Sequence, residues 1–243
     1  MSDKGGKDRV FARALSDVKA FEFNDTVANV FQDMISRSVP GYALLLHMIG
    51  LYADIFVQPG SRVFDLGCSL GEATQVIADR AGDVDCEIVA VDSSAAMINK
   101  CGQLRTAAKK IQWRCEDIRQ TEISNASMVV LNLTLQFLPP EERLALLHKI
   151  QLGLNPGGIL VLSEKVVFDD ATENERMVQL YQGFKKTMGY SDLEISQKRN
   201  ALENVLIPDS EAQHLQRLND AGFDEFYQCF RSFNFVSYLA IKA

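Results

Sequence analysis

The stretch Val63-Phe64-Asp65-Leu66-Gly67-Cys68-Ser69-Leu70-Gly71-Glu72 decides the fold. An apolar run ends in an acid and leads into a turn bounded by glycines, after which a helix begins. At the carboxyl end of a buried parallel strand, such a turn lets the backbone approach a ligand closely. The dinucleotide-binding pattern G-x-G-x-x-G does not fit, because Ser69 and Glu72 stand where its second and third glycines belong. The pattern that fits is D-x-G-x-x-x-G, although a tight turn without any ligand satisfies it too.

Further polar residues follow apolar runs in a regular order. The run 88–91 ends at Asp92, about 25 residues after Gly67, where an acid is placed to bind both hydroxyls of a ribose. A third run leads to Asp117, which could accept a hydrogen bond from an adenine amino group, and a fourth ends at Asn132. The turn LNPGG (154–158) then leads into another apolar strand. This order of elements resembles the class I fold of S-adenosylmethionine (SAM) enzymes.

Size and charge limit the classes of protein to consider. The 243 residues suffice for one α/β domain with additions, and the formal net charge is −7. An acidic chain neutralises few phosphates, so we expect no direct binding of nucleic acid. The basic clusters are short, and two of them, 105–110 and Lys185-Lys186, are expected on solvated helix faces.

Cysteine and histidine usage adds to this picture. The five cysteines form no C-x-x-C pair, which is typical of reduced thiols in a cytoplasmic protein. The three histidines are isolated and give no metal-ligand spacing, so we expect no metal. No signal peptide and no apolar run of transmembrane length is present in the sequence, so we expect no membrane association.

The order of elements predicts the domain organisation. Residues 1–24 are expected to be a flexible arm, and residues 25–243 a single SAM-binding domain. Its helical cover, 25–57, contains one helix from Asp25 to the break at Pro40-Gly41 and a second helix after that break. Strands and helices then alternate over 61–163, which indicates a parallel sheet with helices on both faces.

The last third of the chain interrupts this alternation. A helical insertion over 166–208, with breaks at Gly183, Gly189 and Tyr190, is long for a connection and suggests a lid or a dimer contact. Two closing strands, 224–231 and 234–241, must pair antiparallel. The predicted fold class is α/β, a class I SAM-methyltransferase (Rossmann-like) fold with a seven-stranded, mostly parallel sheet, an antiparallel C-terminal strand and helical additions.

The segment after the fourth strand narrows the chemistry. It reads Asn132-Leu133-Thr134-Leu135, without the proline and aromatic residue that would hold a flipped adenine. No cysteine nucleophile and no carboxylate cluster for a metal lies nearby, and no ready general base is evident. Ordinary methyl transfer by a familiar route is therefore not supported.

Longer strings resemble the bacterial carboxy-S-adenosyl-L-methionine (carboxy-SAM) synthases. They are SVPGY (38–42), DLGCSLG (65–71), NASMVVLNLTLQFL (125–138), LNPGG (154–158), LVLSEK (160–165), YSDLEISQKR (190–199) and LENV (202–205). The resemblance covers residues 25–241, including the insertion. It implies conversion of SAM and prephenate to carboxy-SAM and phenylpyruvate, and a product that serves the modification of a wobble uridine in tRNA.

The resemblance also implies the site residues. Tyr42 and Arg199 would be catalytic, with the guanidinium of Arg199 pairing with a carboxylate. Ser93 stands where relatives can carry asparagine, and its backbone amide serves equally well. The implied cofactor contacts are Tyr42, Gly67, Cys68, Ser69, Asp92, Ser93, Asp117, Ile118, Asn132 and Arg199.

The implied reaction needs few acid–base groups from the protein. A sulfonium acidifies its methyl protons, and decarboxylation of prephenate with loss of hydroxide could supply both carbon dioxide and a local base. The protein would hold two ligands, exclude water and stabilise carboxylates. We also expect a homodimer, because the insertion exceeds what a monomeric core needs. Two alternatives stay open: a conventional methyltransferase acting on a small acid or tRNA, and a protein that only binds its ligand.

Overall fold

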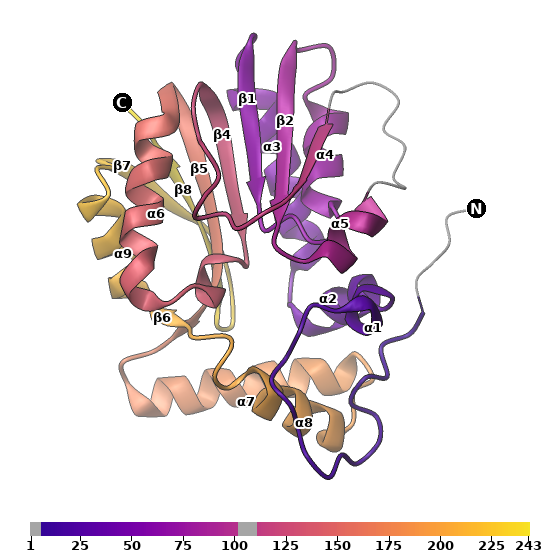
Figure 1. The fold of residues 1–243 in the computed structure, drawn as a ribbon. Coiled ribbons are helices and arrows are strands. Elements are labelled where there is room, and N and C mark those ends of the chain that lie inside the picture. The colour runs from indigo at the N-terminus through magenta and orange to yellow at the C-terminus, as the bar shows by residue number, and fades with distance from the viewer. Residues whose placement is uncertain (1–5, 102–110) are drawn as a thin grey trace.

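The computed structural model describes residues 6–101 and 111–243 (Figure 1). Its strands are β1 (Ser61–Leu66), β2 (Cys86–Asp92), β3 (Ile111–Cys115), β4 (Ala126–Asn132), β5 (Leu154–Val167), β6 (Asp209–Ser210), β7 (Glu225–Ser232) and β8 (Phe235–Ile241). The helices are α1 (Asp25–Ala28), α2 (Phe31–Ser38), α3 (Tyr42–Phe56), α4 (Glu72–Arg80), α5 (Ala95–Cys101), the 3₁₀ helix η1 (Leu135–Phe137), α6 (Pro140–Gly153), α7 (Ala171–Thr187), α8 (Asp192–Leu202) and α9 (Glu211–Asp220).

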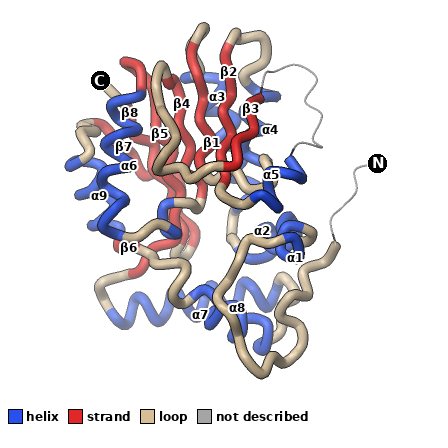
Figure 2. The backbone as a smooth tube through the Cα atoms, viewed as in Figure 1, coloured by secondary structure: helices blue, strands red, loops and turns tan. Residues whose placement is uncertain are grey.

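The sheet has the predicted architecture. Seven strands follow the order β3-β2-β1-β4-β5-β8-β7, and the short β6 pairs with β5. Strands β1 to β5 are mutually parallel, whereas β8 runs antiparallel to both β5 and β7. Figure 2 shows the strands side by side with helices on both faces of the sheet. The predicted fold class is therefore confirmed.

Two apolar cores cover the two faces of the sheet. Because side chains alternate along a strand, Val63 and Phe64 point to opposite faces. Phe64 lies in a core with residues of α6 and α9, among them Leu147 and Leu218. Val63 lies in a second core with residues of α3 and α4, among them Ile77. Burial on both faces explains why the parallel strands are continuous apolar runs.

Two glycines shape the turn after β1. Gly67 and Gly71 have φ angles of 83° and 79°, in the left-handed region that favours glycine. A Cβ at Gly67 would lie 2.3 Å from Oγ1 of Thr134, and a Cβ at Gly71 would lie 2.5 Å from the Trp113 ring. The turn therefore needs both glycines for their conformation and for the space around them.

Some predicted boundaries were wrong. The single helix predicted from Asp25 is divided into α1 and α2, because Val30 leaves the helical region at φ −124° and ψ 5°. Gly183 does not break the insertion, since it lies inside α7, while Gly189 does follow the end of that helix. The fifth strand is longer than the predicted 158–163, because β5 pairs with β4, β8 and β6 along its length.

The described part of the N-terminal arm lies against the insertion. The side-chain amide of Gln197 in α8 donates to the carbonyls of Phe11 and Arg13, each at 2.9 Å. The Phe21 amide donates to the carbonyl of Ala201 at 2.9 Å, and both phenylalanines are buried. Flexibility of the arm stays a prediction about dynamics, but Phe11, Arg13 and Phe21 of this segment contact α8.

Candidate functional site

A cavity of about 500 Å³ opens where the parallel strands end. The sheet, α2, and the insertion helices α7 and α8 form its walls, and these helices lie below the sheet in Figure 1. The topology explains this position, because parallel strands bring their carboxyl ends to one edge. All ten predicted site residues line this cavity: Tyr42, Gly67, Cys68, Ser69, Asp92, Ser93, Asp117, Ile118, Asn132 and Arg199.

Asp92 holds the glycine turn from the end of β2. One carboxylate oxygen accepts from the Ser69 amide at 2.9 Å, and the other accepts from the Ser94 amide at 2.8 Å. Burial raises the pKa of Asp92, while these two N–H donors act against that rise. Each oxygen keeps a free lone pair, so the carboxylate can also accept from the hydroxyls of a ligand.

Asp65, the acid of the D-x-G-x-x-x-G motif, binds another residue of the protein. It is buried and accepts a hydrogen bond from the Thr74 hydroxyl in α4 at 2.5 Å. Burial raises the pKa of Asp65 to about 6 despite that bond. Asp65 thus ties the end of β1 to α4 and fixes the turn between them.

Tyr42 begins α3 just after Gly41, whose φ of 79° lets the chain reverse. The phenol donates to a carboxylate oxygen of Glu72 at 2.8 Å, and the side chain is buried in the cavity wall. Burial, followed by the charge of Glu72, raises the pKa of Tyr42 well above its usual value. Tyr42 is therefore a neutral hydrogen-bonding group in the wall of the cavity.

Within the described residues, Asn132 has an unpaired polar atom in the cavity wall. Its side-chain oxygen is buried and has no hydrogen-bond partner among the described residues. Leaving a buried polar atom unpaired is costly, so this oxygen is available to accept a hydrogen bond from a ligand in the cavity. This residue ends β4 and lines the cavity.

Asp117 has a partner that the sequence did not reveal. The Arg119 guanidinium binds the Asp117 carboxylate, with Nε at 2.9 Å from each oxygen. This bond is the largest of the effects that lower the pKa of Asp117. Arg119 also lines the cavity. An adenine amino group would therefore share the carboxylate with this arginine.

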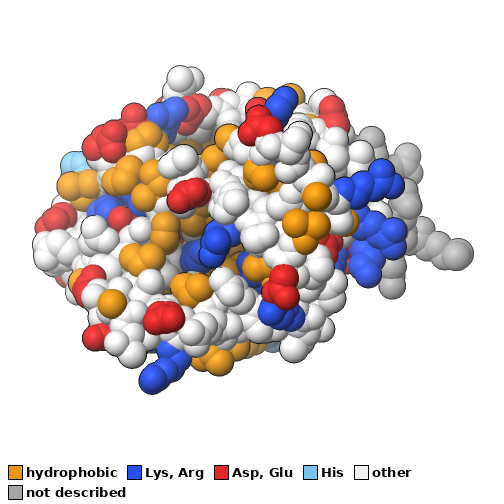
Figure 3. Space-filling view, turned by 90° about the horizontal axis from the view of Figure 1, so that it is seen from below, with side chains coloured by type: hydrophobic (Ala, Val, Ile, Leu, Met, Phe, Trp, Pro, Cys, Tyr) orange, Lys and Arg blue, Asp and Glu red, His pale blue; other side chains and the backbone are white. Residues whose placement is uncertain are grey.

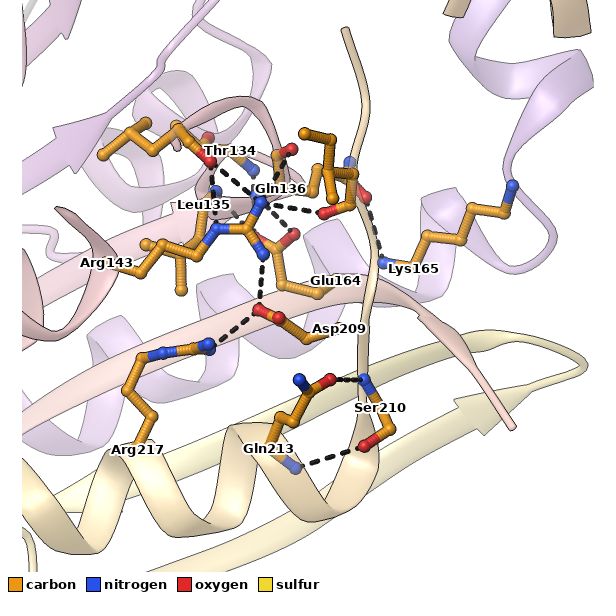
Figure 4. Close-up of polar contacts among 12 residues, drawn as sticks. Thr134, Leu135, Gln136, Arg143, Glu164, Lys165, Asp209, Ser210, Gln213 and Arg217 are labelled. Atoms are coloured by element: carbon orange, nitrogen blue, oxygen red, sulfur yellow. Dashed lines mark hydrogen bonds and ion pairs between the residues drawn. The ribbon is translucent and has the colours of Figure 1, made fainter. Parts of the chain in front are cut away.

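A buried polar network holds the segment after β4 (Figure 4). The Glu164 carboxylate accepts from the amides of Thr134, Leu135 and Gln136 at 3.1, 2.8 and 3.0 Å. Burial raises the pKa of Glu164 to about 8, outweighing these donors. The network therefore fixes the start of η1 and the preceding Thr134, whose side chain lies against Gly67. The only hint of it in the sequence is an acid inside an apolar run.

Basic residues from three elements form another wall of the cavity. Lys165 follows Glu164 in β5, Lys185 lies in α7, and Lys198 and Arg199 lie in α8. Figure 3 views the molecule from below, and blue Lys or Arg side chains lie near the middle of this face among apolar ones. Lys185 was predicted on a solvated helix face, which was wrong: it is 7% exposed, because α7 turns it toward the cavity. The basic cluster 105–110 lies outside the described residues.

Aromatic rings close the side of the cavity next to α2. Phe23 packs between Phe31 and Phe137, with ring centroids 6.1 and 5.3 Å apart. Phe21 and Phe23 belong to the segment predicted as an arm, so that segment contributes to the cavity wall. The sequence did not identify these rings as site residues, since nothing local links residues 21–23 to 137.

The described residues form neither a metal-ligand cluster nor a single membrane-spanning helix. In residues 6–101 and 111–243, no group of three or more His, Cys, Asp or Glu side chains is arranged to hold a metal ion. No single helix in these ranges is long and apolar enough to cross a membrane, although α2 and α3 jointly reach that length and composition with a bend of 99°.

Comparison with known proteins defines the class. Residues 63–158 match the model of the methyltransferase domain family. Human N-acetylserotonin methyltransferase in complex with SAM has a TM-score of 0.61 at 16% identity, covering 90% of this chain and 55% of that one. Magnesium protoporphyrin IX methyltransferase from Synechocystis PCC 6803 with bound SAH has a TM-score of 0.60 at 15% identity, covering 86% and 87%. The chain thus has the class I SAM-dependent methyltransferase fold.

Closer relatives define the family. A protein of Shewanella sp. (strain MR-7) is 51% identical over 97% of this chain and 98% of its own length. A protein of Vibrio campbellii is 48% identical over the full length of both chains. Both are named carboxy-S-adenosyl-L-methionine synthase, and the chain belongs to that family.

Proposed function

We propose that this protein converts SAM and prephenate into carboxy-SAM and phenylpyruvate. The observation that carries the proposal is the uneven charge of the cavity. Asp65, Asp92 and Asp117 line it at the carboxyl ends of β1, β2 and β3, where Arg119 pairs with Asp117. Four basic residues, including Arg199, line its wall at β5, α7 and α8. An acidic region suits a sulfonium substrate with an ammonium group, and a basic region suits a dicarboxylate.

The residues present fit SAM. Asp92 has lone pairs for the ribose hydroxyls, and the free Asn132 oxygen can accept an N–H. Gly67 lets the backbone approach the ligand, and Tyr42 is held in the cavity wall by its hydrogen bond to Glu72. Arg199 carries a planar guanidinium with no ion pair among the described residues, so its donors are available for the carboxylate that the product gains.

The overall reaction balances without a catalytic base from the protein. Prephenate loses carbon dioxide and hydroxide as its ring becomes aromatic, the hydroxide leaves as water with one methyl proton, and the carbon dioxide becomes the new carboxylate. The three aspartates that line the cavity are all engaged: Asp65 by Thr74, Asp92 by two amides and Asp117 by Arg119. The protein's role is to position both substrates and exclude water.

We place this activity in the cytoplasm and in a homodimer, without direct contact to nucleic acid or a membrane. The carboxylated product would leave for a separate enzyme that modifies a wobble uridine in tRNA. The name of the curated relatives supports the product, and the net charge of −7 supports the absence of nucleic-acid contact.

The test is a mass measurement with labelled substrate. Purified protein is incubated with SAM and prephenate whose ring carboxyl carries ¹³C, and the products are separated by chromatography. We expect phenylpyruvate and a SAM derivative heavier by about 44 Da, the mass of one carbon dioxide, plus the label. The control replaces prephenate with phenylpyruvate and labelled bicarbonate. Formation of demethylated SAM and a methylated acid would instead identify a conventional methyltransferase.

A further inference from the structure

Three lysines, of which Lys185 and Lys198 are buried and Lys165 is half-buried, meet in the cavity wall made by β5, α7 and α8. Lys165 and Lys185 both lie against the Tyr181 ring, with Nζ 5.4 and 4.4 Å from its centroid. Lys198 donates to the Ser38 hydroxyl at 2.9 Å, and its Nζ is 5.7 Å from the Tyr190 ring. Figure 4 shows the Lys165 side chain extending away from the Arg143–Asp209 network.

None of these three ammonium groups forms an ion pair with a carboxylate of the described residues. Lys185 and Lys198 are only 7% and 9% exposed. Elsewhere in the described structure the buried cations are paired: Arg143 lies against Asp209, and Arg37 lies 2.6 Å from Asp33. A buried cation without a carboxylate partner is costly, so two such cations beside the half-buried Lys165 indicate a missing anion.

The charges also repel one another. Lys198, Lys165 and Arg199 each disfavour the charge on Lys185, and together with burial, the largest cause, they lower its pKa to about 7. Burial lowers the pKa of Lys198 to about 8, although Asp8 acts in the opposite direction. The Asp8 carboxylate is itself engaged, because it accepts from the Tyr190 phenol at 2.6 Å. An anion among the lysines would relieve this repulsion.

We propose that Lys165, Lys185 and Lys198 form a subsite for the carboxylate that the second substrate keeps through the reaction, the carboxylate of a 2-oxo acid side chain. The proposal rests on the proposed function, which gives that substrate two carboxylates. Arg199 is assigned to the carboxyl group that moves, so the remaining carboxylate needs a separate set of cations. Tyr181 gives the carbon skeleton a flat surface, and Phe235 holds its ring edge-on at 5.2 Å.

The subsite is tested with phenylpyruvate, which keeps only the 2-oxo carboxylate. Lys165→Met and Lys185→Met keep the apolar stems and remove the charges. We expect each variant to bind phenylpyruvate at least about tenfold more weakly by titration calorimetry, and to raise KM for prephenate by a similar factor. The Kd for SAM stays within about twofold.

Two further variants separate binding from structure. Lys186→Met is the matched control, because Lys186 is the next residue in α7 but is exposed and paired with Asp192 at 2.6 Å. Lys185→Arg restores the charge and should restore most of the binding. Without ligand, Lys185→Met should melt at or above the wild-type temperature, since it removes a repelled charge. Phenylpyruvate should raise the melting temperature of the wild type and not that of Lys185→Met.

Each combination of results decides between the two proposals. Lysine-dependent binding of phenylpyruvate without formation of carboxy-SAM from prephenate would support the subsite and overturn the proposed function. Carboxy-SAM formation with unchanged phenylpyruvate binding and KM in Lys165→Met and Lys185→Met would overturn the subsite alone. A wild-type protein that neither binds phenylpyruvate nor forms carboxy-SAM would overturn both.

Discussion

Asp92 has one amide donor on each carboxylate oxygen and still has lone pairs facing the cavity. Asp92→Ala removes the acceptor for the ribose and also releases the Ser69 amide from its place. We expect SAM to bind more weakly by about 1–3 kcal/mol, measured by titration calorimetry. The control is Asp85→Ala, because Asp85 is an exposed acid just before β2, and its SAM affinity should equal that of the wild type. Unchanged SAM affinity in a folded Asp92→Ala protein would exclude the ribose contact.

Arg199 lies in the last turn of α8, where it lines the cavity and is exposed to solvent. Its substitution should therefore not disturb the core. Arg199→Ala should keep the fold and most SAM affinity but lose about 2–4 kcal/mol of preference for carboxy-SAM over SAM, and lose turnover with prephenate. Arg199→Lys should recover only part of this preference. The ammonium restores the positive charge but lacks the planar guanidinium that binds both carboxylate oxygens. Competition binding measures the preference for carboxy-SAM over SAM, and mass spectrometry measures turnover with prephenate. Turnover of Arg199→Ala at the wild-type rate would assign the transferred carboxylate to another group.

Lys185 gives a pH dependence whose sign follows from its pKa. The folded protein lowers that pKa from 10.5 to about 7, through burial and the charges of Lys198, Lys165 and Arg199, while the neutral Tyr181 phenol faces the same space. The unfolded chain therefore binds the proton more tightly, and this destabilisation is complete below pH 7 and disappears as the pH rises toward 10.5.

The difference between Lys185→Met and wild type isolates this effect. The variant should have the larger free energy of unfolding below pH 7, and its advantage should shrink steadily toward pH 10 in urea titrations. Lys186→Met, whose charge is exposed, should show no such trend. A difference that is independent of pH would mean that Lys185 is not perturbed in the folded protein.

At the scale of elements, a buried ion pair joins β6 to α6. Arg143 in α6 is fully buried and binds Asp209 in β6, and Arg143 also donates to the carbonyls of Leu138 and Ile207 at 2.8 Å. These bonds hold the connection after α8, and with it the residues around 203–206, against the end of the sheet. The pair therefore anchors the chain that leaves the insertion.

Asp209→Ala should destabilise the protein by about 3–5 kcal/mol, because it leaves Arg143 buried without its carboxylate. Urea unfolding followed by circular dichroism measures this loss. The control is Asp54→Ala, which breaks the exposed pair with Arg80 at 3.4 Å and should cost less than about 1 kcal/mol. Equal effects of the two substitutions would show that the buried pair has no special structural role.

At the scale of the whole molecule, the insertion presents apolar side chains to solvent. The exposed fraction is 46% for Leu180 in α7, 38% for Met188 in the connection and 40% for Leu193 in α8. An exposed apolar group on an insertion longer than a monomer needs is typical of an interface. We therefore expect a homodimer with α7 and α8 at or near the contact.

Light scattering on a sizing column should give twice the chain mass at micromolar concentration. Leu180→Asp combined with Leu193→Asp should yield a monomer with unchanged far-ultraviolet circular dichroism. Leu215→Asp, on α9 and 38% exposed, should leave the dimer intact. A monomeric wild-type protein would contradict the predicted dimer. A dimer that persists in the double variant would show that α7 and α8 do not form the interface.

The sequence by itself determined the fold and one half of the cavity. Strand and helix periods are local properties, and Gly67 and Gly71 are required by a local turn. Parallel strands then bring Asp92, Asp117 and Asn132 to one edge without further information. The positions of these residues in the cavity could therefore be predicted, and the resemblance to a known family added Tyr42 and Arg199.

Only the tertiary structure decided the other half. Lys165 and Lys185 face one ring, and Phe23 packs on Phe137, although each pair comes from distant segments. Lys185 was predicted in solvent because a short basic cluster usually lies on a solvated helix face, whereas the packing of α7 buries it. Burial of charge and ring contacts depends on packing between elements, which local sequence patterns do not encode.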